Sequence, residues 1–187
     1  MNGIKLLATG SALPERVVTN EDMTKIVDTS DEWIHSRTGI SSRRHCSGNE
    51  SHTSLCLAAA RQALDRAGIS PQQVGVCLVA TLTQDFLHTA ECLLAAAPRK
   101  YALVVGCEVL SRVTDFTDRS TCVLFGDGAG AALVEWRADY PSLHAVLGCR
   151  GNREALIIPG VNTGSPYYIH MDGQTVFRFA VEALPRC

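Results

Sequence analysis

The run Val74-Gly-Val-Cys-Leu-Val-Ala80 decides the fold class, because it is continuously apolar and has the length of a β-strand. Such a run is expected of a parallel strand that is covered on both faces. An amphipathic helix is predicted before it over residues 54–67, ended by Gly68, and a second buried strand after it over Tyr101-Ala-Leu-Val-Val105. Because helices alternate with buried strands, the sequence predicts an α/β protein with a mainly parallel or mixed sheet.

The remaining elements are predicted from caps, breakers and apolar runs. Asn20 and Ser30 are expected to serve as the N-caps of two helices. Leu57, Ala60 and Leu64 are expected to form the apolar stripe of the helix over 54–67. The other elements, in chain order, are a strand over 4–9 ended by Gly10, a short helix over 89–97 ended by Pro98, strands over 122–125 and 131–135, and a helix from about Gly173.

The composition excludes several classes of protein. The chain has 187 residues with 17 basic and 19 acidic side chains, a formal net charge of −2 and 46% hydrophobic residues. Such a length usually corresponds to one globular domain. A near-neutral charge argues against nucleic acid as a partner, and no apolar run approaches the roughly 20 residues of a membrane span. No signal peptide is evident at the start, so we expect a cytoplasmic protein with no nucleic-acid or membrane partner.

Eight cysteines are present, and no two of them form a CxxC pair. Most lie in apolar runs, where a free thiol behaves as a small buried hydrophobe. We therefore expect no disulfides. The six histidines show no HxxxH or HxH spacing, so no metal site is expected either. Cys107 follows Gly106 at the end of a predicted strand, where a reactive thiol is reasonable, but a packed cysteine is the favoured interpretation.

The string Phe125-Gly-Asp-Gly-Ala-Gly-Ala-Ala132 is the most distinctive one in the chain. Its alternate glycines suggest a nucleotide-binding loop, but a dinucleotide fingerprint needs the spacing GxGxxG between a strand and a helix. Here a predicted strand follows instead of a helix. We therefore predict a tight strand-to-strand turn where two backbones approach closely.

Trp33 and Arg37 are four residues apart and share one face if their segment is helical. Together with Arg119, which follows two acidic residues, they would be able to stack a base and hold phosphates. The alternative is a core tryptophan with surface arginines, and composition alone favours that alternative.

Several strings taken together resemble one family, the β-ketoacyl-acyl-carrier-protein synthases III of the thiolase superfamily. The strings are Thr9-Gly-Ser-Ala-Leu-Pro14, Asp28-Thr-Ser-Asp-Glu-Trp-Ile34, Arg37-Thr-Gly-Ile40, Tyr101-Ala-Leu-Val-Val-Gly106, Glu108-Val-Leu-Ser-Arg112, Thr117-Asp-Arg119, Phe125-Gly-Asp-Gly-Ala-Gly-Ala-Ala132 and His170-Met-Asp-Gly-Gln-Thr-Val-Phe177. The resemblance implies a layered, thiolase-like α/β fold with a mixed sheet, present only in part. Residues 1–135 would form the N-terminal half, and residues 136–187 a linker with the beginning of the second half.

The same resemblance implies a function. An acyl group passes from acetyl-CoA or another acyl-CoA to a cysteine, and then joins the two-carbon unit left when malonyl-acyl-carrier protein loses CO₂. The implied enzyme is an acyltransferase of fatty-acid synthesis that works as a homodimer without a cofactor. Trp33 and Arg119 would sandwich the adenine of coenzyme A (CoA), and Thr29 and Arg37 would line the same entrance.

The departures from the family matter as much as the matches. The family nucleophile lies in an Ala-Ala-Cys-(Ala/Ser)-Gly-Phe string, but here Ala97 passes directly to Pro98, so one strand-helix unit is missing after about residue 97. Cys92 and Cys107 lie at other family positions, and the family His and Asn are not present, so no catalytic residue is assigned. We therefore expect a strained or rebuilt Ala97–Pro98 link and a chain that is inactive as written. The alternative is a non-catalytic homologue that binds CoA or a partner subunit.

Overall fold

The computed structural model describes residues 2–81, 99–146, 148–159 and 167–183. The predicted helix over 89–97, the Ala97–Pro98 link and Cys92 lie outside these residues. The chain divides into two compact units. Unit 1 comprises Met1–Glu15, Cys46–Val109 and Asp127–Leu147, and unit 2 comprises Arg16–His45, Leu110–Gly126 and Gly148–Cys187.

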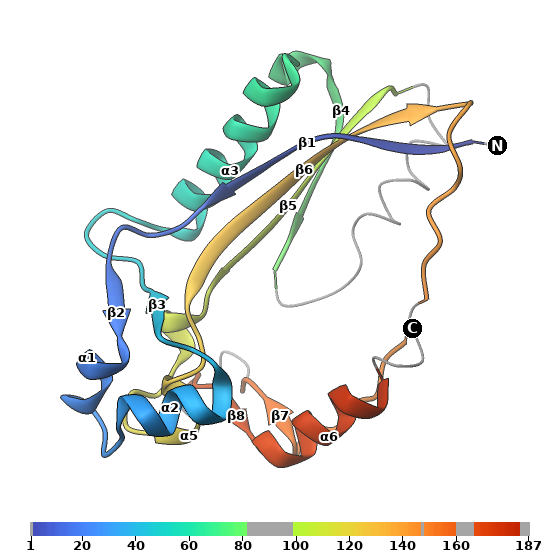
Figure 1. Ribbon diagram of the computed structural model, residues 1–187. Helices are drawn as coiled ribbons and strands as arrows, with labels where there is room; N and C mark the ends of the chain where they lie inside the picture. The colour runs from blue at the N-terminus through green and yellow to red at the C-terminus, as the bar shows by residue number, and fades with distance from the viewer. Residues whose placement is uncertain (1, 82–98, 147, 160–166, 184–187) are drawn as a thin grey trace. The chain divides into compact units, whose positions relative to one another are not determined.

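Unit 1 is a four-stranded mixed sheet with one long helix packed on it (Figure 1). The strands are β1 (Gly3–Ala12), β4 (Val74–Ala80), β5 (Tyr101–Val109) and β6 (Asp127–Arg137), in the order β1-β6-β5-β4. Strand β6 pairs antiparallel with β1 and β5, and β4 pairs parallel with β5. The predicted mixed α/β class is therefore confirmed.

Helix α3 (His52–Ala67) covers the sheet because its small residues let it approach the strands closely. A Cβ atom at Gly10 of β1 would overlap the carbonyl oxygen of Ala59, so Gly10 is needed inside a strand that was predicted to end there. Gly68 ends the helix in the left-handed conformation, at φ 66°, as predicted. The predicted stripe is partly wrong, since Leu57 is 49% exposed, and the buried residues are Leu55, Ala59, Ala63 and Leu64.

Three further strand predictions need correction. Strand β4 is only partly covered, with Val79 half exposed, because it lies at the end of the sheet order with β5 as its partner. Strand β5 continues through Gly106 to Val109. Residues 122–125 do not form a strand: Cys122 ends the short helix α5 (Arg119–Cys122), because the Asp118 side chain accepts a hydrogen bond from the Ser120 N–H and caps that helix.

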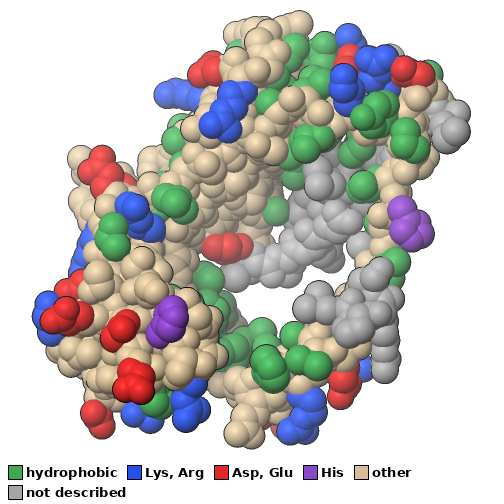
Figure 2. Space-filling model, viewed as in Figure 1, with side chains coloured by type: hydrophobic (Ala, Val, Ile, Leu, Met, Phe, Trp, Pro, Cys, Tyr) green, Lys and Arg blue, Asp and Glu red, His purple; other side chains and the backbone are tan. Residues whose placement is uncertain are grey.

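Unit 2 is built from short elements. They are β2 (Val17–Thr19), α1 (Asn20–Thr24), α2 (Asp31–Thr38), β3 (Ser42–Arg44), a 3₁₀ turn (Leu110–Val113), α5, β7 (Leu156–Ile157), β8 (His170–Met171) and α6 (Gly173–Ala183). Strand β2 pairs with β3 and β7 with β8, both antiparallel. Ser30 caps α2 as predicted, but Thr19 rather than Asn20 caps α1. The helix predicted from about Gly173 is confirmed as α6, and its apolar side chains Phe177, Phe179 and Val181 are exposed. Figure 2 shows hydrophobic side chains on the surface where α6 lies.

Candidate functional site

Trp33 lies in unit 2, on helix α2, where two local signals hold it in place. The Ser30 hydroxyl accepts a hydrogen bond from the Trp33 N–H at 3.1 Å, and Gly39 ends the helix at φ 72°. Trp33 packs against a buried apolar cluster that includes Ile34 and Met23, while part of its ring stays accessible. Trp33 is therefore only partly a core residue, and its role in binding a base stays a prediction.

Two guanidinium groups lie on the Trp33 ring. The Arg37 Cζ atom is 4.8 Å from the ring centroid and the Arg119 Cζ atom is 4.7 Å from it. A guanidinium over an indole face at this distance is a favourable cation–π contact, worth about 0.5–1 kcal/mol at an exposed site. The structure thus brings together three of the four residues predicted to hold CoA.

Arg119 is held by its neighbours on the chain and by one distant carbonyl. It is the first residue of α5, and its Nη1 donates to the backbone oxygen of Asp28 at 2.8 Å. Burial raises the pKa of the preceding Asp118, but hydrogen bonds from Ser120 and Thr121 outweigh it and hold that pKa below its usual value. The carboxylate at this helix start is therefore ionised at neutral pH.

We call Trp33, Arg37 and Arg119 the clamp. Thr29, which follows Asp28 in the chain, contributes a polar atom that has no hydrogen-bond partner among the described residues. This atom is its Oγ1, which is buried. Buried hydroxyls normally have a hydrogen-bond partner, which this oxygen lacks in that part of the chain. The adjoining open depression has a volume of about 450 Å³ and is lined by Ile26, Val27, Asp28, Thr117 and Arg119.

The clamp is closed as it stands. Stacked groups need about 3.5 Å between them, so a base inserted between the Trp33 and Arg119 planes requires a gap of about 7 Å. The observed distance of 4.7 Å is too short for that insertion. Binding of a base therefore requires Arg119 to swing outward, and its hydrogen bond to the Asp28 carbonyl would break or lengthen.

The remaining candidates, Cys107 and the glycines of strand β6, belong to unit 1. Cys107 is 2% exposed, and burial together with neighbouring Cys56 raises its pKa to about 12. A thiol with such a pKa is protonated at neutral pH and is a poor nucleophile. Gly128 and Gly130 lie inside strand β6, so the predicted turn at this string is wrong. The predicted close approach of two backbones is present at Gly126, where a Cβ would lie 3.1 Å from the carbonyl oxygen of Arg44.

Sequence reasoning missed Asp28 as part of the clamp, since it contributes through a backbone carbonyl and not through its side chain. No residue-type signal would have revealed that contact. In the described part of the chain, no helix is both long enough and apolar enough to cross a bilayer.

Comparisons with known proteins identify the family of this chain. Residues 83–151 match the family model for 3-oxoacyl-[acyl-carrier-protein] synthase III. The β-ketoacyl-[acyl-carrier-protein] synthase III of Clostridium acetobutylicum is 38% identical over 98% of this chain and 70% of its own length. That of Neisseria meningitidis serogroup C (strain FAM18) is 39% identical over all of this chain and 70% of its own length.

Solved structures show the same fold. The crystal structure of 3-oxoacyl-[acyl-carrier-protein] synthase III from Aquifex aeolicus superposes with a TM-score of 0.86 at 35% identity, over 98% of this chain and 69% of that one. The fold is thus that of the thiolase-like condensing enzymes. The chain belongs to the β-ketoacyl-acyl-carrier-protein synthase III family, whose members are acyltransferases of fatty-acid synthesis.

Proposed function

We propose that this chain is built on the plan of an enzyme that condenses an acyl group with malonyl-acyl-carrier protein. It binds an acyl-CoA, such as acetyl-CoA, through Trp33, Arg37, Arg119 and Thr29, but does not itself accept the acyl group. The observation that carries the proposal is the Trp33 ring with two guanidinium groups within 5 Å of it. The adenine would stack on the open part of the ring once Arg119 moves. The guanidinium groups would then face the phosphates, for which arginine is well suited.

The family reaction has two stages. A cysteine thiolate attacks the thioester carbonyl of acyl-CoA, so that the carbon–sulfur bond to CoA breaks and CoA leaves as a thiol. Malonyl-acyl-carrier protein then loses CO₂, and the enolate carbon attacks the acyl-cysteine carbonyl. A carbon–carbon bond forms, the carbon–sulfur bond to the cysteine breaks, and the products are 3-oxoacyl-carrier protein and the free cysteine thiolate. We propose that this chain forms a homodimer in the cytoplasm and needs no cofactor.

The acyl-accepting cysteine has no counterpart in these 187 residues. The alignment with the Neisseria relative runs over 227 positions although this chain has only 187 residues, so parts of the relative have no counterpart here. We propose that the N-terminal region, residues 1–135, lacks one strand-helix unit after about residue 97, and that this unit carries the nucleophile in the family. Residues 136–187 would be a linker and the beginning of the second half of the fold. The 187-residue chain by itself then binds CoA without being acylated.

Calorimetric titration with CoA tests the clamp. We expect Trp33→Ala to weaken binding about tenfold or more, because stacking of a base on an aromatic ring is worth about 1–3 kcal/mol. Arg119→Ala should weaken it by a smaller factor, and adenosine 3′,5′-bisphosphate should compete with CoA. Arg150→Ala is the matched control, because Arg150 makes the same kind of contact with the Phe179 ring elsewhere in unit 2. Equal affinity in wild type and Trp33→Ala would contradict the proposal.

Incubation with radiolabelled acetyl-CoA tests the second claim. We expect CoA binding with no covalent label on any cysteine, which is the behaviour of the non-catalytic alternative. Stable labelling of a cysteine, located by peptide mass spectrometry, would contradict the loss of the nucleophile and leave the clamp intact.

A further inference from the structure

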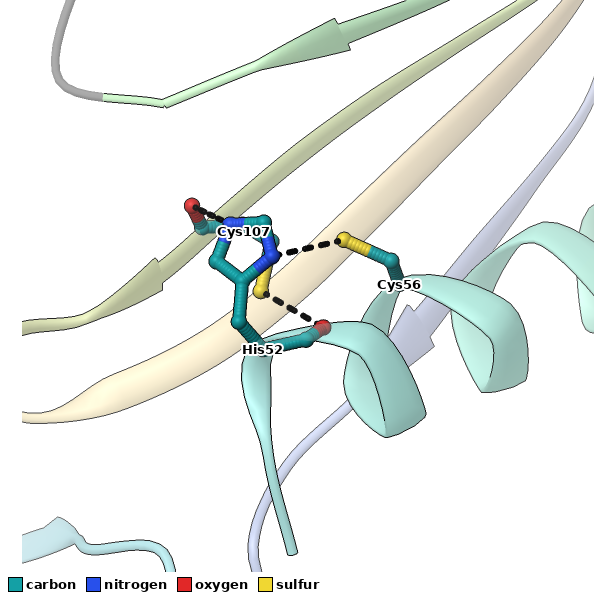
Figure 3. Close-up of side chains that lie close together, drawn as sticks. All are labelled: His52, Cys56 and Cys107. Atoms are coloured by element: carbon teal, nitrogen blue, oxygen red, sulfur yellow. Dashed lines mark hydrogen bonds between the residues drawn. The ribbon is translucent and has the colours of Figure 1, made fainter.

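Three side chains with metal-binding atoms converge in unit 1, between helix α3 and strand β5 (Figure 3). They are His52 at the start of α3, Cys56 one turn later, and Cys107 on β5. No two of their ligand atoms are more than 4.8 Å apart, and the His52 Nδ1 to Cys56 Sγ distance is 3.6 Å. These three residues are called the thiol–imidazole cluster below.

A backbone carbonyl already orients the imidazole of His52. Its Nε2 lies 3.2 Å from the backbone oxygen of Cys107. A carbonyl oxygen only accepts hydrogen bonds, so Nε2 donates in this contact, and Nδ1 faces Cys56 Sγ at 3.6 Å. A ligating histidine commonly donates its other N–H to a backbone carbonyl, which fixes the ring.

The spacing of the cluster fits a small tetrahedral cation. Zinc bonds of about 2.3 Å to sulfur and about 2.0 Å to nitrogen place the ligand atoms of a tetrahedron about 3.6–3.8 Å apart. The pair of Nδ1 and Cys56 Sγ has that separation already. Closing the remaining separations from at most 4.8 Å needs only small side-chain rotations.

The surroundings of the cluster also suit such a cation. Cys107 is buried, while His52 and Cys56 are half-buried, so the cluster is reachable and yet partly shielded from water. Two thiolates would neutralise a divalent charge, and sulfur with imidazole is a ligand set that selects a borderline-soft ion over magnesium or calcium.

We propose that His52 Nδ1, Cys56 Sγ and Cys107 Sγ form a binding site for a zinc-class divalent cation, with water at the fourth position. Binding breaks two S–H bonds and forms two metal–sulfur bonds, and both protons leave to the buffer. No group is oxidised or reduced. The proposal is independent of CoA binding, because the cluster lies in unit 1 and the clamp in unit 2.

No metal site was expected from the sequence, and the proposed site has no continuous spacing that would have suggested it. His52 and Cys56 have the four-residue spacing that aligns two ligands on one helix face, but the third ligand comes from a strand far along the chain. Only the packing of α3 on the sheet brings Cys107 to them.

Cobalt and zinc titrations of the reduced full chain, pretreated with a chelator, test the proposal. We expect one Co²⁺ per chain with a thiolate-to-cobalt absorption band in the near ultraviolet, its displacement by Zn²⁺, and about two protons released per Zn²⁺. Cys56→Ser and Cys107→Ser should each weaken binding about tenfold to a hundredfold. Cys77→Ser is the matched control, because Cys77 is an exposed thiol of the same unit, and it should bind as wild type does.

A second measurement on wild-type protein does not depend on the folding of any variant. Zn²⁺ should protect Cys56 and Cys107 from alkylation, as read by peptide mass spectrometry, while Cys77 and Cys149 react at the same rate with and without the metal. Absence of the cobalt band would overturn the proposal, as would unchanged affinity in the two serine variants. Equal protection of all cysteines would overturn it too. So would a chain that shows no metal affinity but forms a Cys56–Cys107 disulfide with hydrogen peroxide.

Discussion

The two units of this chain fill their interiors differently. Of the six buried polar or charged residues in the described ranges, five lie in unit 2, whereas the centre of unit 1 is made of apolar residues such as Leu133 and Val105. In unit 1 the long strands satisfy their backbone groups with each other, so side chains are free to be apolar. The short elements of unit 2 leave some backbone carbonyl groups without a backbone donor, and buried polar side chains donate hydrogen bonds to them.

Arg43 and Asn20 are the centre of that polar arrangement. The Arg43 guanidinium donates to the Asn20 Oδ1 at 2.8 Å, the Val123 oxygen at 2.9 Å and the Val18 oxygen at 3.3 Å. Asn20 in turn donates to the backbone oxygen of Ile40 at 2.7 Å. One side chain thereby joins β2, α1 and the segment after α5. Burial lowers the pKa of Arg43 from its ordinary value, but an arginine stays charged at neutral pH.

The largest expected effect comes from a substitution that creates a cavity in the apolar centre of unit 1. Leu133 is fully buried, so Leu133→Ala should lower the free energy of unfolding by about 4 kcal/mol, because a large cavity is left in a close-packed core. Urea unfolding measures the change. The matched control is Leu6→Ala in the same sheet, because Leu6 is 56% exposed and should cost less than about 1 kcal/mol. Equal losses in the two variants would show that unit 1 has no apolar centre.

The next effect comes from the polar centre of unit 2. Arg43→Met keeps most of the volume but leaves three acceptors without their donor, and we expect a loss of about 3 kcal/mol. Arg44→Met is the neighbouring arginine control and should cost less than Arg43→Met. An Arg43→Met chain as stable as wild type, by the same urea measurement, would mean that the network stabilises nothing.

A smaller effect should be the same in both units. Gly39 in unit 2 and Gly68 in unit 1 each end a helix with positive φ, and neither has an atom within 4 Å of an added Cβ. Substitution of either by alanine is therefore expected to cost about 1 kcal/mol of backbone strain. Thermal unfolding of the two variants measures this. If the stability losses of the two variants differ by much more than about 1 kcal/mol, packing, and not the local conformation, governs one of the two helix ends.

The smallest expected effect is a loss of stability at alkaline pH that is absent at neutral pH. Burial raises the pKa of Cys122 in unit 2 from its usual 9.0. The folded chain holds this proton more tightly than the unfolded chain does, so its contribution to stability is complete below pH 9 and is lost as the pH rises above it. In urea unfolding at pH 8 and pH 10, Cys122→Ala should show a smaller loss of stability on alkalinisation than wild type. An identical loss in both would contradict the assignment.

The fold class and the clamp around Trp33 were accessible from the sequence to different degrees. Helix α3, strands β4 and β5, the Ser30 cap and helix α6 were predicted because their signals are local. Residues 122–125 were predicted as a strand because an apolar run does not distinguish a strand from the end of a buried helix. Trp33, Arg37 and Arg119 were named from family strings, and their contact distances required the structure.

The sequence by itself determined the α/β class, the family and the residue types proposed to bind CoA, because caps, apolar periodicity and contiguous motifs depend on neighbouring residues. The tertiary structure decided what depends on distant residues. It showed Gly10 inside β1 under α3, Arg119 tied to the Asp28 carbonyl, Arg43 joining three segments, and Cys107 beside His52 and Cys56. Such contacts are set by how helices and strands pack, and no spacing along the chain encodes them.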